Sequence, residues 1–426
     1  MAEYQIPFGK SVLTFQLPDV LQAEWIAPPQ TAAHPDPQKT VEEALANTVG
    51  NISLEEFKGL RNVAIAINDK TRPVPHQHLL PPLIAKLEAL GFSPENILLV
   101  IATGTHPVMP ETEYDKILPK EIYTRYPVIC HNARQQESLV YFGQTRRNTP
   151  VWINRAYTQA DLKIVVGNIE PHQFQGFSGG YKSAAIGLAG LETINTNHAM
   201  MQHADARLGE YQNNPARQDI EEMGHMIGVQ FALNAILNEK KEIVEVLAGD
   251  PVSVMQAGIP LSRKICQIAV QTPFHLVIAS PGGHPKDINI YQSQKGLAHA
   301  RMVTVDGGTI ILAAECSEGS GSRGYEEWMR DKKSYTQILN AFAHEGFRTG
   351  PHKGFQIARD ASQINLQWYS GLEPEFAERL LLNPVADLQN AISQAVQKLP
   401  PGARIGIMPR AASTIPYLQH HHRNEP

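Results

Sequence analysis

The fold is decided by residues 166–198, which read VGNIEPHQFQGFSGGYKSAAIGLAGLETINTNH. They follow an apolar, β-branched run, LKIVV, which is typical of a short buried strand. A polar loop containing His172 comes next, and a glycine-rich turn leads to Lys182 and to a predicted small-residue helix, AAIGLAGL. His198 lies 16 residues after Lys182, beyond a predicted helix end at 193–197. One lysine and two histidines are thus predicted near one strand end.

Each of these residues has an ordinary structural interpretation when it is taken alone. Glycines make tight turns, a lysine at a helix start is commonly solvated, and a single histidine is commonly an ordinary polar residue. Their concentration in one loop favours a functional interpretation, because α/β proteins place functional groups in loops at the carboxyl ends of strands.

A phosphate-binding loop is the main alternative for this stretch. Lys182 and Ser183 match the end of the G-x-x-x-x-G-K-[ST] motif, but Tyr181 stands where that motif has a glycine. The strand also ends about nine residues before the first glycine of the turn, whereas the motif follows its strand directly. A nucleotide-binding, ATPase-like protein built on Lys182-Ser183 is therefore the second hypothesis.

The composition is that of a globular protein with two or three domains: 426 residues, 42% hydrophobic and 19% charged. A net charge of −5, without a basic run, argues against a nucleic-acid partner. No apolar run reaches membrane-spanning length, and the first ten residues lack an apolar signal core, which predicts a cytoplasmic protein with no membrane partner. Three scattered cysteines fit a reducing compartment. Metal binding by the consecutive histidines 420–422 would be adventitious.

A strand, a polar tip and a helix follow one another three times in the first half of the chain. The three strands are RNVAIAIND, NILLVIA and LKIVV. This alternation predicts an α/β fold with a parallel sheet, in which all strand C-termini lie along one edge. Asp69 and Arg72, His106 and His172 occupy the three tips, so we expect them to converge in one crevice.

A second series of the same kind begins near residue 275, with strands in FHLVIAS, GTIILAAE and ARIGIMP. Residues 1–30 alternate like a hairpin, and the turn-prone QTP at 271–273 marks a boundary. We predict an N-terminal α/β domain at 1–270, which carries Lys182 and His198, and a C-terminal α/β domain at 275–400. The terminal strand and tail at 401–426 are assigned a return to the first domain. The active site is expected in the cleft between the two domains.

The second domain offers a helix at 288–300 directly after the strand tip PGGHPKD. Gln292 and Lys295 are three residues apart and share one face of this helix. A solvated face is the ordinary interpretation of such residues. The preceding tip favours ligand binding instead, because the amino end of a helix attracts anions.

The candidate residues indicate a chemistry. His106 and His172, on separate strand tips, suit acid–base catalysis near neutral pH from opposite sides of a substrate. Arg72 and Lys295 suit binding of a carboxylate or phosphate, Arg72 through its planar fork. The chain has no HExxH, GxSxG or strand-linked GxGxxG motif, which argues against a zincin, a nucleophile elbow or a freely exchanging NAD.

Five separated motifs together resemble the nickel-dependent lactate racemase family. They are NDKTRPVP at 68–75, TGTHP at 103–107, EPHQFQGFSGGYKS at 170–183, His198, and PKDINIYQSQK at 285–295. The resemblance spans most of the chain and keeps the order of the motifs. It implies two α/β domains and a nickel-pincer nucleotide, a pyridinium mononucleotide with two sulfur arms and a carbon–nickel bond.

The resemblance also implies roles for individual residues. Lys182 would bind the cofactor covalently through a thioamide, and His198 would be the protein ligand to nickel. His106 and His172 would be the catalytic acid–base pair. The remaining cofactor and substrate contacts would come from Asp69, Lys70, Thr71, Arg72, Tyr291, Gln292 and Lys295. A neutral imidazole suits nickel, and an amine is a suitable nucleophile for a thioacid.

The implied activity is a racemase or epimerase that inverts Cα of a small 2-hydroxy acid by reversible hydride transfer to the cofactor. Cofactor-making proteins are implied as loading partners, and an oligomer is compatible with the sequence. A nickel-cofactor carrier without turnover is a third hypothesis, which His106 and His172 make unnecessary. Trp328 and Trp368 are the candidates for an aromatic substrate contact from the second domain.

Overall fold

The computed structural model describes residues 1–19, 21, 23–28 and 30–419, so the predicted histidine tail at 420–422 lies outside it. The chain divides into two compact units. The terminal unit contains Met1–Pro29 and Cys266–Pro426, and the inserted unit contains Gln30–Ile265. Within the described ranges, no helix combines the length and the apolar character that crossing a bilayer requires.

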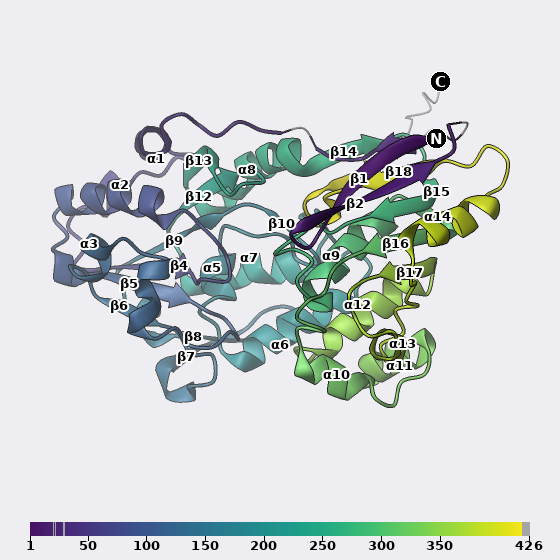
Figure 1. Ribbon diagram of the computed structural model, residues 1–426. Coiled ribbons are helices and arrows are strands. Elements are labelled where there is room, and N and C mark those ends of the chain that lie inside the picture. Colours follow the sequence, from purple (N-terminus) through teal and green to yellow (C-terminus); the bar gives the residue numbers. More distant parts are fainter. Residues whose placement is uncertain (20, 22, 29, 420–426) are drawn as a thin grey trace, which may run out of the picture. The chain divides into compact units, whose positions relative to one another are not determined.

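The inserted unit is built on a six-stranded sheet in the order β13-β12-β9-β4-β5-β6 (Figure 1). All neighbours pair in parallel except β13, which is antiparallel to β12. The strands are β4 (Val63–Asn68), β5 (Ile97–Ala102), β6 (Val128–Cys130), β9 (Leu162–Asn168), β12 (Phe231–Leu237) and β13 (Ile243–Gly249). Two small hairpins flank the sheet: β7 (Leu139–Gln144) with β8 (Pro150–Asn154), and β10 (Pro171–His172) with β11 (Gly176–Phe177).

Helices cover both faces of this sheet, which explains why its central strands are apolar throughout rather than alternating. Alternate residues of β4 show the division: Ile65 faces a core with α1 and α2, and Ala66 faces a core with the later helices. The helices of the unit are α1 (Pro37–Ala46), α2 (His76–Ala89), α3 (Lys120–Tyr123), α4 (Arg155–Thr158), α5 (Lys182–Ala185), α6 (Leu191–Ala199), α7 (Pro215–Ile227) and α8 (Pro251–Cys266).

The predicted small-residue helix at 184–191 is largely wrong. Helix α5 ends at Ala185, and the chain then turns towards α6. Gly187 lies against the backbone of Ser183, where an added Cβ would stand 2.4 Å from the carbonyl oxygen. The predicted helix end at 193–197 is also wrong, because these residues form the middle of α6 and His198 is itself helical.

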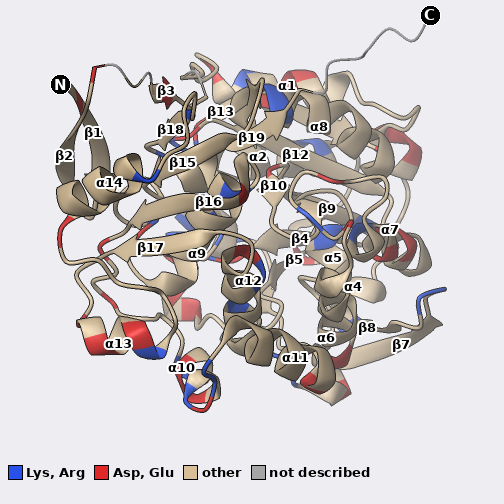
Figure 2. Cartoon of the chain, turned by 90° about the vertical axis from the view of Figure 1, so that its right-hand side faces the viewer, with Lys and Arg blue, Asp and Glu red and all other residues tan. Residues whose placement is uncertain are grey.

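The terminal unit has a five-stranded parallel sheet in the order β17-β16-β15-β18-β3. Its strands are β3 (Ala23–Trp25), β15 (Phe274–Ala279), β16 (Thr304–Ala313), β17 (Asn365–Tyr369) and β18 (Ile405–Met408), with a separate pair β14 (Gln267–Val270) and β19 (Ile415–Leu418). The helices are α9 (Ile290–Arg301), α10 (Arg323–Met329), α11 (Tyr335–Glu345), α12 (Pro351–Ala361), α13 (Pro374–Arg379) and α14 (Leu388–Gln397). Figure 2 shows acidic and basic residues intermixed on α10 and α13.

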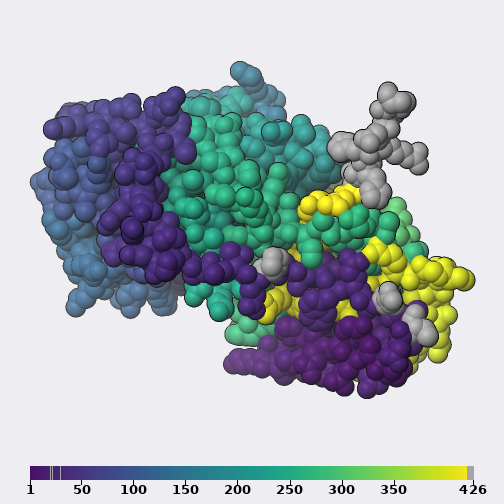
Figure 3. Space-filling model, turned by 90° about the horizontal axis from the view of Figure 1, so that it is seen from above, coloured from purple at the N-terminus to yellow at the C-terminus, as the bar shows by residue number. Residues whose placement is uncertain are grey.

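The division into units differs from the predicted boundaries at both ends of the chain. Residues 1–29, predicted in the first domain, belong to the terminal unit, and the strand predicted to return to the first domain, β18, pairs with β15 and β3. The hairpin of β1 (Ala2–Phe8) and β2 (Ser11–Leu17) covers the terminal sheet together with α14, through a core that includes Ile6 and Ile392. Figure 3 shows the dark purple N-terminal residues beside the yellow C-terminal ones. These contacts are distant in sequence, so no local pattern indicates them.

Candidate active site

A cavity of about 100 Å³ lies among the loops at the carboxyl ends of the inserted unit's strands. Strand β4 stands between β9 and β5, so the loops that follow these strands meet there. Five predicted site residues line the cavity: Asp69, Arg72, His106, Lys182 and His198. Asp69, Arg72 and His106 thus meet at one edge of the sheet, as their positions after parallel strands predict, whereas His172 does not line the cavity. Lys182 reaches it from α5 and His198 from α6.

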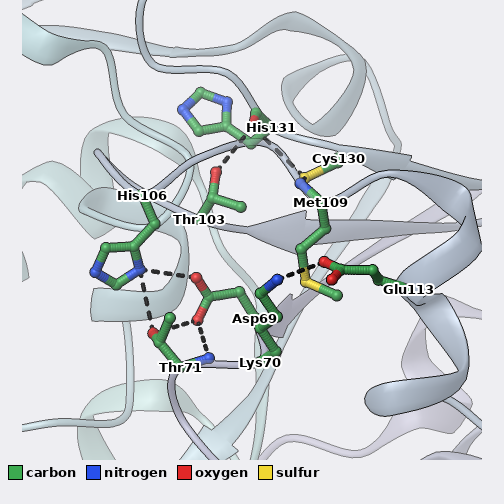
Figure 4. A network of polar contacts seen from close by, with 9 residues as sticks. All are labelled: Asp69, Lys70, Thr71, Thr103, His106, Met109, Glu113, Cys130 and His131. Atoms are coloured by element: carbon green, nitrogen blue, oxygen red, sulfur yellow. Dashed lines mark hydrogen bonds and ion pairs between the residues drawn. The ribbon is translucent and has the colours of Figure 1, made fainter.

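A hydrogen-bonded group at the rim joins the tips of β4 and β5 (Figure 4). Oδ2 of Asp69 lies 2.7 Å from Nδ1 of His106. The other carboxylate oxygen, Oδ1, accepts hydrogen bonds from the backbone N–H of Thr71 at 3.1 Å and from its hydroxyl at 2.7 Å. The hydroxyl oxygen of Thr71 also lies 3.2 Å from Nδ1 of His106. Asp69 is buried, whereas the His106 side chain is 43% exposed and accessible to a ligand.

Two opposing effects set the protonation of Asp69. Burial raises its pKa. The hydrogen bonds from His106 and Thr71 together lower the pKa by more than burial raises it, so the net change is downward. Asp69 is therefore a carboxylate at neutral pH. Lys70, predicted as a cofactor contact, instead forms an ion pair with Glu113 and does not line the cavity (Figure 4).

Lys182 is buried at the cavity wall, 8% exposed. Burial lowers the pKa of its amine well below the usual value, and the positive charges of Arg72 and Arg217 lower it further against the opposing effect of Glu170. Among the described residues, none accepts or donates a hydrogen bond at Nζ of Lys182. Burial thus favours the uncharged amine, which is the nucleophilic form.

The glycine-rich turn before Lys182 is fixed by two buried side chains. Gly179 and Gly180 have φ of +89° and +55°, and the N–H of Gly180 donates to Oδ1 of Asn234 at 2.7 Å. Arg217 is completely buried, and its guanidinium donates to the carbonyls of Phe177 and Gly179 at 3.0–3.2 Å. Sequence reasoning missed both Asn234 and Arg217, because they come from β12 and α7.

His198 projects from α6 into the same cavity. Burial lowers its pKa to about 3; a proton on Lys182 would act in the same direction, as does the positive charge of Arg72. Its imidazole is therefore neutral, the form that binds metals. In the part of the chain that the structure describes, no three His, Cys, Asp or Glu side chains form a group that could hold a metal ion.

His172 lies beside the cavity rather than among the residues that line it. Its ring contacts Phe174 edge-on at 4.9 Å between centroids, and Phe174 contacts His198 in the same way at 5.0 Å. The backbone N–H of Gln175 donates to Nδ1 of His172 at 3.2 Å. This histidine is thus tied to its own tight hairpin, β10–β11.

The three predicted site residues of the terminal unit share helix α9. Nζ of Lys295 donates to Oε1 of Gln292 at 2.8 Å, so the two side chains lie on one face, as their spacing predicts. The hydroxyl of Tyr291 lies 3.4 Å from Nε2 of His352. Asn289 caps the helix by accepting the N–H of Gln292 at 3.0 Å.

Sequence reasoning also missed His352 and Lys353, which begin α12 beside α9. Nζ of Lys353 lies 4.5 Å from the centroid of the Tyr291 ring and donates to Gln294 at 3.1 Å. Their signal is a His-Lys pair directly after Gly350-Pro351, a helix-start pattern. Trp368 is fully buried in the sheet core, and Trp328 on α10 donates to Glu345.

Comparison with known proteins assigns the chain to a family. Residues 8–209 match the family model described as the lactate racemase N-terminal domain, and residues 269–415 match the lactate racemase C-terminal domain. A lactate racemase of Thermoanaerobacterium thermosaccharolyticum is 30% identical over 425 residues, which cover 97% of this chain and 99% of that protein. The chain belongs to the lactate racemase family.

Other members and solved structures agree with this assignment. The lactate racemase of Lactiplantibacillus plantarum is 28% identical, over 97% of this chain and 100% of that one. The lactate racemase apoprotein structure from T. thermosaccharolyticum superposes with a TM-score of 0.89 at 29% identity, covering 97% of this chain and 100% of that chain. A Thermotoga maritima protein, at 18% identity and a TM-score of 0.66 over 91% of this chain and 100% of that chain, supports the fold alone.

Membership of the lactate racemase family implies a nickel-pincer nucleotide cofactor. The cavity residues fit this group. Lys182 offers a buried amine whose uncharged form is favoured, and His198 offers a neutral imidazole as a nitrogen ligand. Because the described residues contain no three-residue metal cluster, a nickel ion held by His198 would have to take its other ligands from the cofactor itself.

Proposed function

We propose that this lactate racemase family member is a racemase or epimerase that inverts Cα of a 2-hydroxy acid. The observation that carries the proposal is the combination found in one cavity. It is lined by a lysine whose burial favours the uncharged amine, by a neutral histidine, and by a histidine hydrogen-bonded to a carboxylate. The surroundings of Lys182 and His198 favour the uncharged forms that the implied chemistry uses.

Lys182 and His198 are proposed to hold the cofactor. The amine of Lys182, whose uncharged form burial favours, would hold the cofactor through a thioamide, formed from a thiocarboxylic acid arm with loss of water. His198 would supply one nitrogen ligand to nickel. Asp69, Thr71 and Arg72 would line the cofactor pocket. Lys70, the other cofactor contact predicted in this stretch, forms an ion pair with Glu113.

When bound, the nickel-pincer nucleotide would supply a reversible acceptor for the Cα hydride of the substrate. The protein must then move one proton at the substrate hydroxyl. We propose that His106 and His172 act at this oxygen, so that the hydroxyl proton leaves as the Cα–H bond breaks and returns when hydride reaches the opposite face. Arg72 and, from the terminal unit, Lys295 would bind the carboxylate, with Tyr291 and Gln292 beside Lys295.

The test is to produce the protein together with cofactor-making enzymes. Intact mass should then show an adduct, and metal analysis should show nickel. Lys182→Ala should abolish the adduct, and His198→Ala should keep it while losing nickel. His106→Ala and His172→Ala should each reduce turnover of a 2-hydroxy acid by about 10²–10⁴-fold. Wild-type protein that carries the adduct and turns over no 2-hydroxy acid would contradict the proposal.

The structure gives the ATPase hypothesis little support. Strand β9 ends at Asn168, and the hairpin β10–β11 separates it from Lys182, so no tight loop joins strand and lysine. A phosphate-binding lysine acts through its positive charge. Burial favours the uncharged form of Lys182 instead. Tight ATP binding without an adduct would restore this hypothesis.

The substrate is proposed to be a small 2-hydroxy acid, and a panel of such acids with matching alcohols that lack the carboxylate would define it. Arg72→Lys should lose about tenfold or more in kcat/KM, because the planar fork is lost although the charge remains. Equal turnover of acids and alcohols would rule out carboxylate recognition. The proposed loading partners are the cofactor-making proteins, and the proposed location is the cytoplasm.

A further inference from the structure

The two proposed catalytic histidines are held by opposite kinds of hydrogen-bonding partner. Nδ1 of His106 lies 2.7 Å from a carboxylate oxygen of Asp69, which can only accept. Nδ1 of His172 lies 3.2 Å from the backbone N–H of Gln175, which can only donate. The partner on one ring nitrogen decides which nitrogen carries the proton in a neutral imidazole. The two rings are therefore held in different tautomers.

For His106, every neighbour at Nδ1 requires a proton on that nitrogen. Asp69 is a carboxylate, since its pKa is lowered overall. The hydroxyl of Thr71 donates to Oδ1 of Asp69, so it can only accept from His106. The neutral ring thus carries Nδ1–H and presents the lone pair of Nε2. When Nε2 takes up a proton, Asp69 stabilises the resulting imidazolium, as a carboxylate beside a catalytic histidine does.

For His172, the donor is fixed in place. The side chain of Gln175 is fully buried and donates to Asn197 at 2.9 Å, and Asn197 in turn donates to Asp219 at 2.9 Å. The N–H of Gln175 therefore keeps its direction towards the ring. Nδ1 must accept it, so the neutral ring carries its proton on Nε2. A second proton, on Nδ1, would set two donors against each other and break this hydrogen bond.

We propose that Asp69 is a positioning residue that makes His106 the proton-accepting base, while Gln175 holds His172 as a neutral hydrogen-bond donor. This inference rests on the proposed function, because it assigns different roles to the two histidines at the substrate hydroxyl. The O–H bond breaks, a new bond forms to Nε2 of His106, and the electron pair stays on oxygen. The Nε2–H of His172 donates to that oxygen as negative charge develops, a role that neutral imidazole fills in other enzymes. The same proton returns from His106 in the reverse step.

The distinguishing variant is Asp69→Asn. Oδ1 of Asp69 accepts both the N–H and the hydroxyl of Thr71, so the oxygen of the asparagine should remain there and its NH₂ should face His106. That NH₂ donates to Nδ1 and forces the proton onto Nε2, which removes the basic lone pair. Thr71→Val is the matched control, because it deletes a neighbour of the same nitrogen and leaves the carboxylate.

The first measurement is ¹⁵N NMR of apoprotein labelled at histidine, with His106→Gln and His172→Gln used for assignment. Wild type should show Nδ1–H at His106 and Nε2–H at His172; Asp69→Asn should reverse His106 alone, and Thr71→Val should reverse neither. Nε2–H at His106 in wild type, or Nδ1–H at His172, overturns the inference. No cofactor is needed, so this result is independent of whether the proposed function holds.

The second measurement uses loaded enzyme, with the adduct on Lys182 quantified by mass. Because Asp69 also lines the cavity, kcat is expressed per loaded enzyme, and on that scale Asp69→Asn should lose about 10⁴-fold, the size seen when a carboxylate-to-amide change imposes the wrong tautomer. Loaded Asp69→Asn with undiminished kcat overturns the positioning role. If loaded wild type converts no 2-hydroxy acid, the proposed function fails instead, and the catalytic part of the inference fails with it.

Discussion

Replacing Arg217 by methionine should destabilise the inserted unit strongly. The guanidinium is completely buried, pairs with Glu221 at 2.6 Å and donates to two carbonyls of the glycine-rich turn. Arg217→Met keeps most of the apolar stem but leaves the Glu221 side chain, only 11% exposed, without its cation. Breaking a buried ion pair by removing one partner costs about 3–5 kcal/mol.

This range converts to a thermal shift that calorimetry can resolve. For a unit of this size, each kcal/mol lowers the midpoint by about 2–4 °C, so the expected drop is about 6–20 °C. Because the chain has two compact units, the calorimetric scan can show two unfolding transitions, and the one whose midpoint falls in the variant is assigned to the inserted unit. The adduct on Lys182 should also form less completely, since the turn that delivers this lysine loses its fixed carbonyls.

The double variant Arg217→Met/Glu221→Met is the control. Replacing a whole buried pair by apolar residues is often close to neutral, so the double variant should recover most of the lost stability. A single-variant shift below about 2 °C would show that the pair adds little net stability. A double variant no better than the single would show that the carbonyl contacts, rather than the unpaired Glu221, account for the loss.

Three further predictions concern the same unit. Lys182→Met should raise the thermal midpoint of the apoprotein, because it removes a buried amine without a hydrogen bond, a burden of about 1–3 kcal/mol; a lower midpoint would contradict this. Burial lowers the pKa of His76 to about 4 and that of His131 to about 4, so the unfolded chain binds more protons between pH 6.5 and 4. The free energy of unfolding should therefore fall as pH drops through this window, by up to about 3 kcal/mol per histidine. In urea unfolding, His76→Asn should make the free energy of unfolding less dependent on pH. Gly224→Ala should lose about 1–3 kcal/mol or more in the same assay, since its Cβ would stand 2.0 Å from the Tyr181 ring, whereas Gly324→Ala, with a nearest neighbour at 3.7 Å, should be tolerated.

The sequence predicts the parts of the site that local pattern controls. Apolar runs ending in polar tips locate β4, β5 and β9, and parallel pairing then places Asp69 and His106 at one edge. The hydrogen bond between Asp69 and His106 was not predicted, because these residues lie 37 positions apart in the sequence and their side chains meet only in the folded sheet. The same holds for Arg217 and Asn234 behind the glycine-rich turn.

Where prediction failed, a tertiary contact overrode the local pattern. AAIGLAGL has small residues suited to a packed helix, yet helix α5 ends at Ala185. Gly187 instead lies against β5 and the loop after it: an added Cβ would stand 2.7 Å from Cβ of Ala102, and its carbonyl accepts the N–H of Gly104 at 2.9 Å. The boundary at 1–270 failed because the N-terminal hairpin resembles any hairpin. Its place in the terminal unit is shown only by packing: its apolar face, which includes Ile6 and Phe15, contacts β15, β16, β18 and α14.

The pairing of β3 with β18 has a consequence for the order in which the chain folds during synthesis. Glu24 and Arg404 form an ion pair although 380 residues separate them. Translation adds about 5–20 residues per second, so β3 waits roughly 20–80 s for its partner. The inserted unit, whose last sheet strand ends at Gly249, is complete long before and can fold during that interval. Strand β3, unpaired during this interval, is only three residues long, which leaves little backbone for a neighbouring nascent chain to pair with.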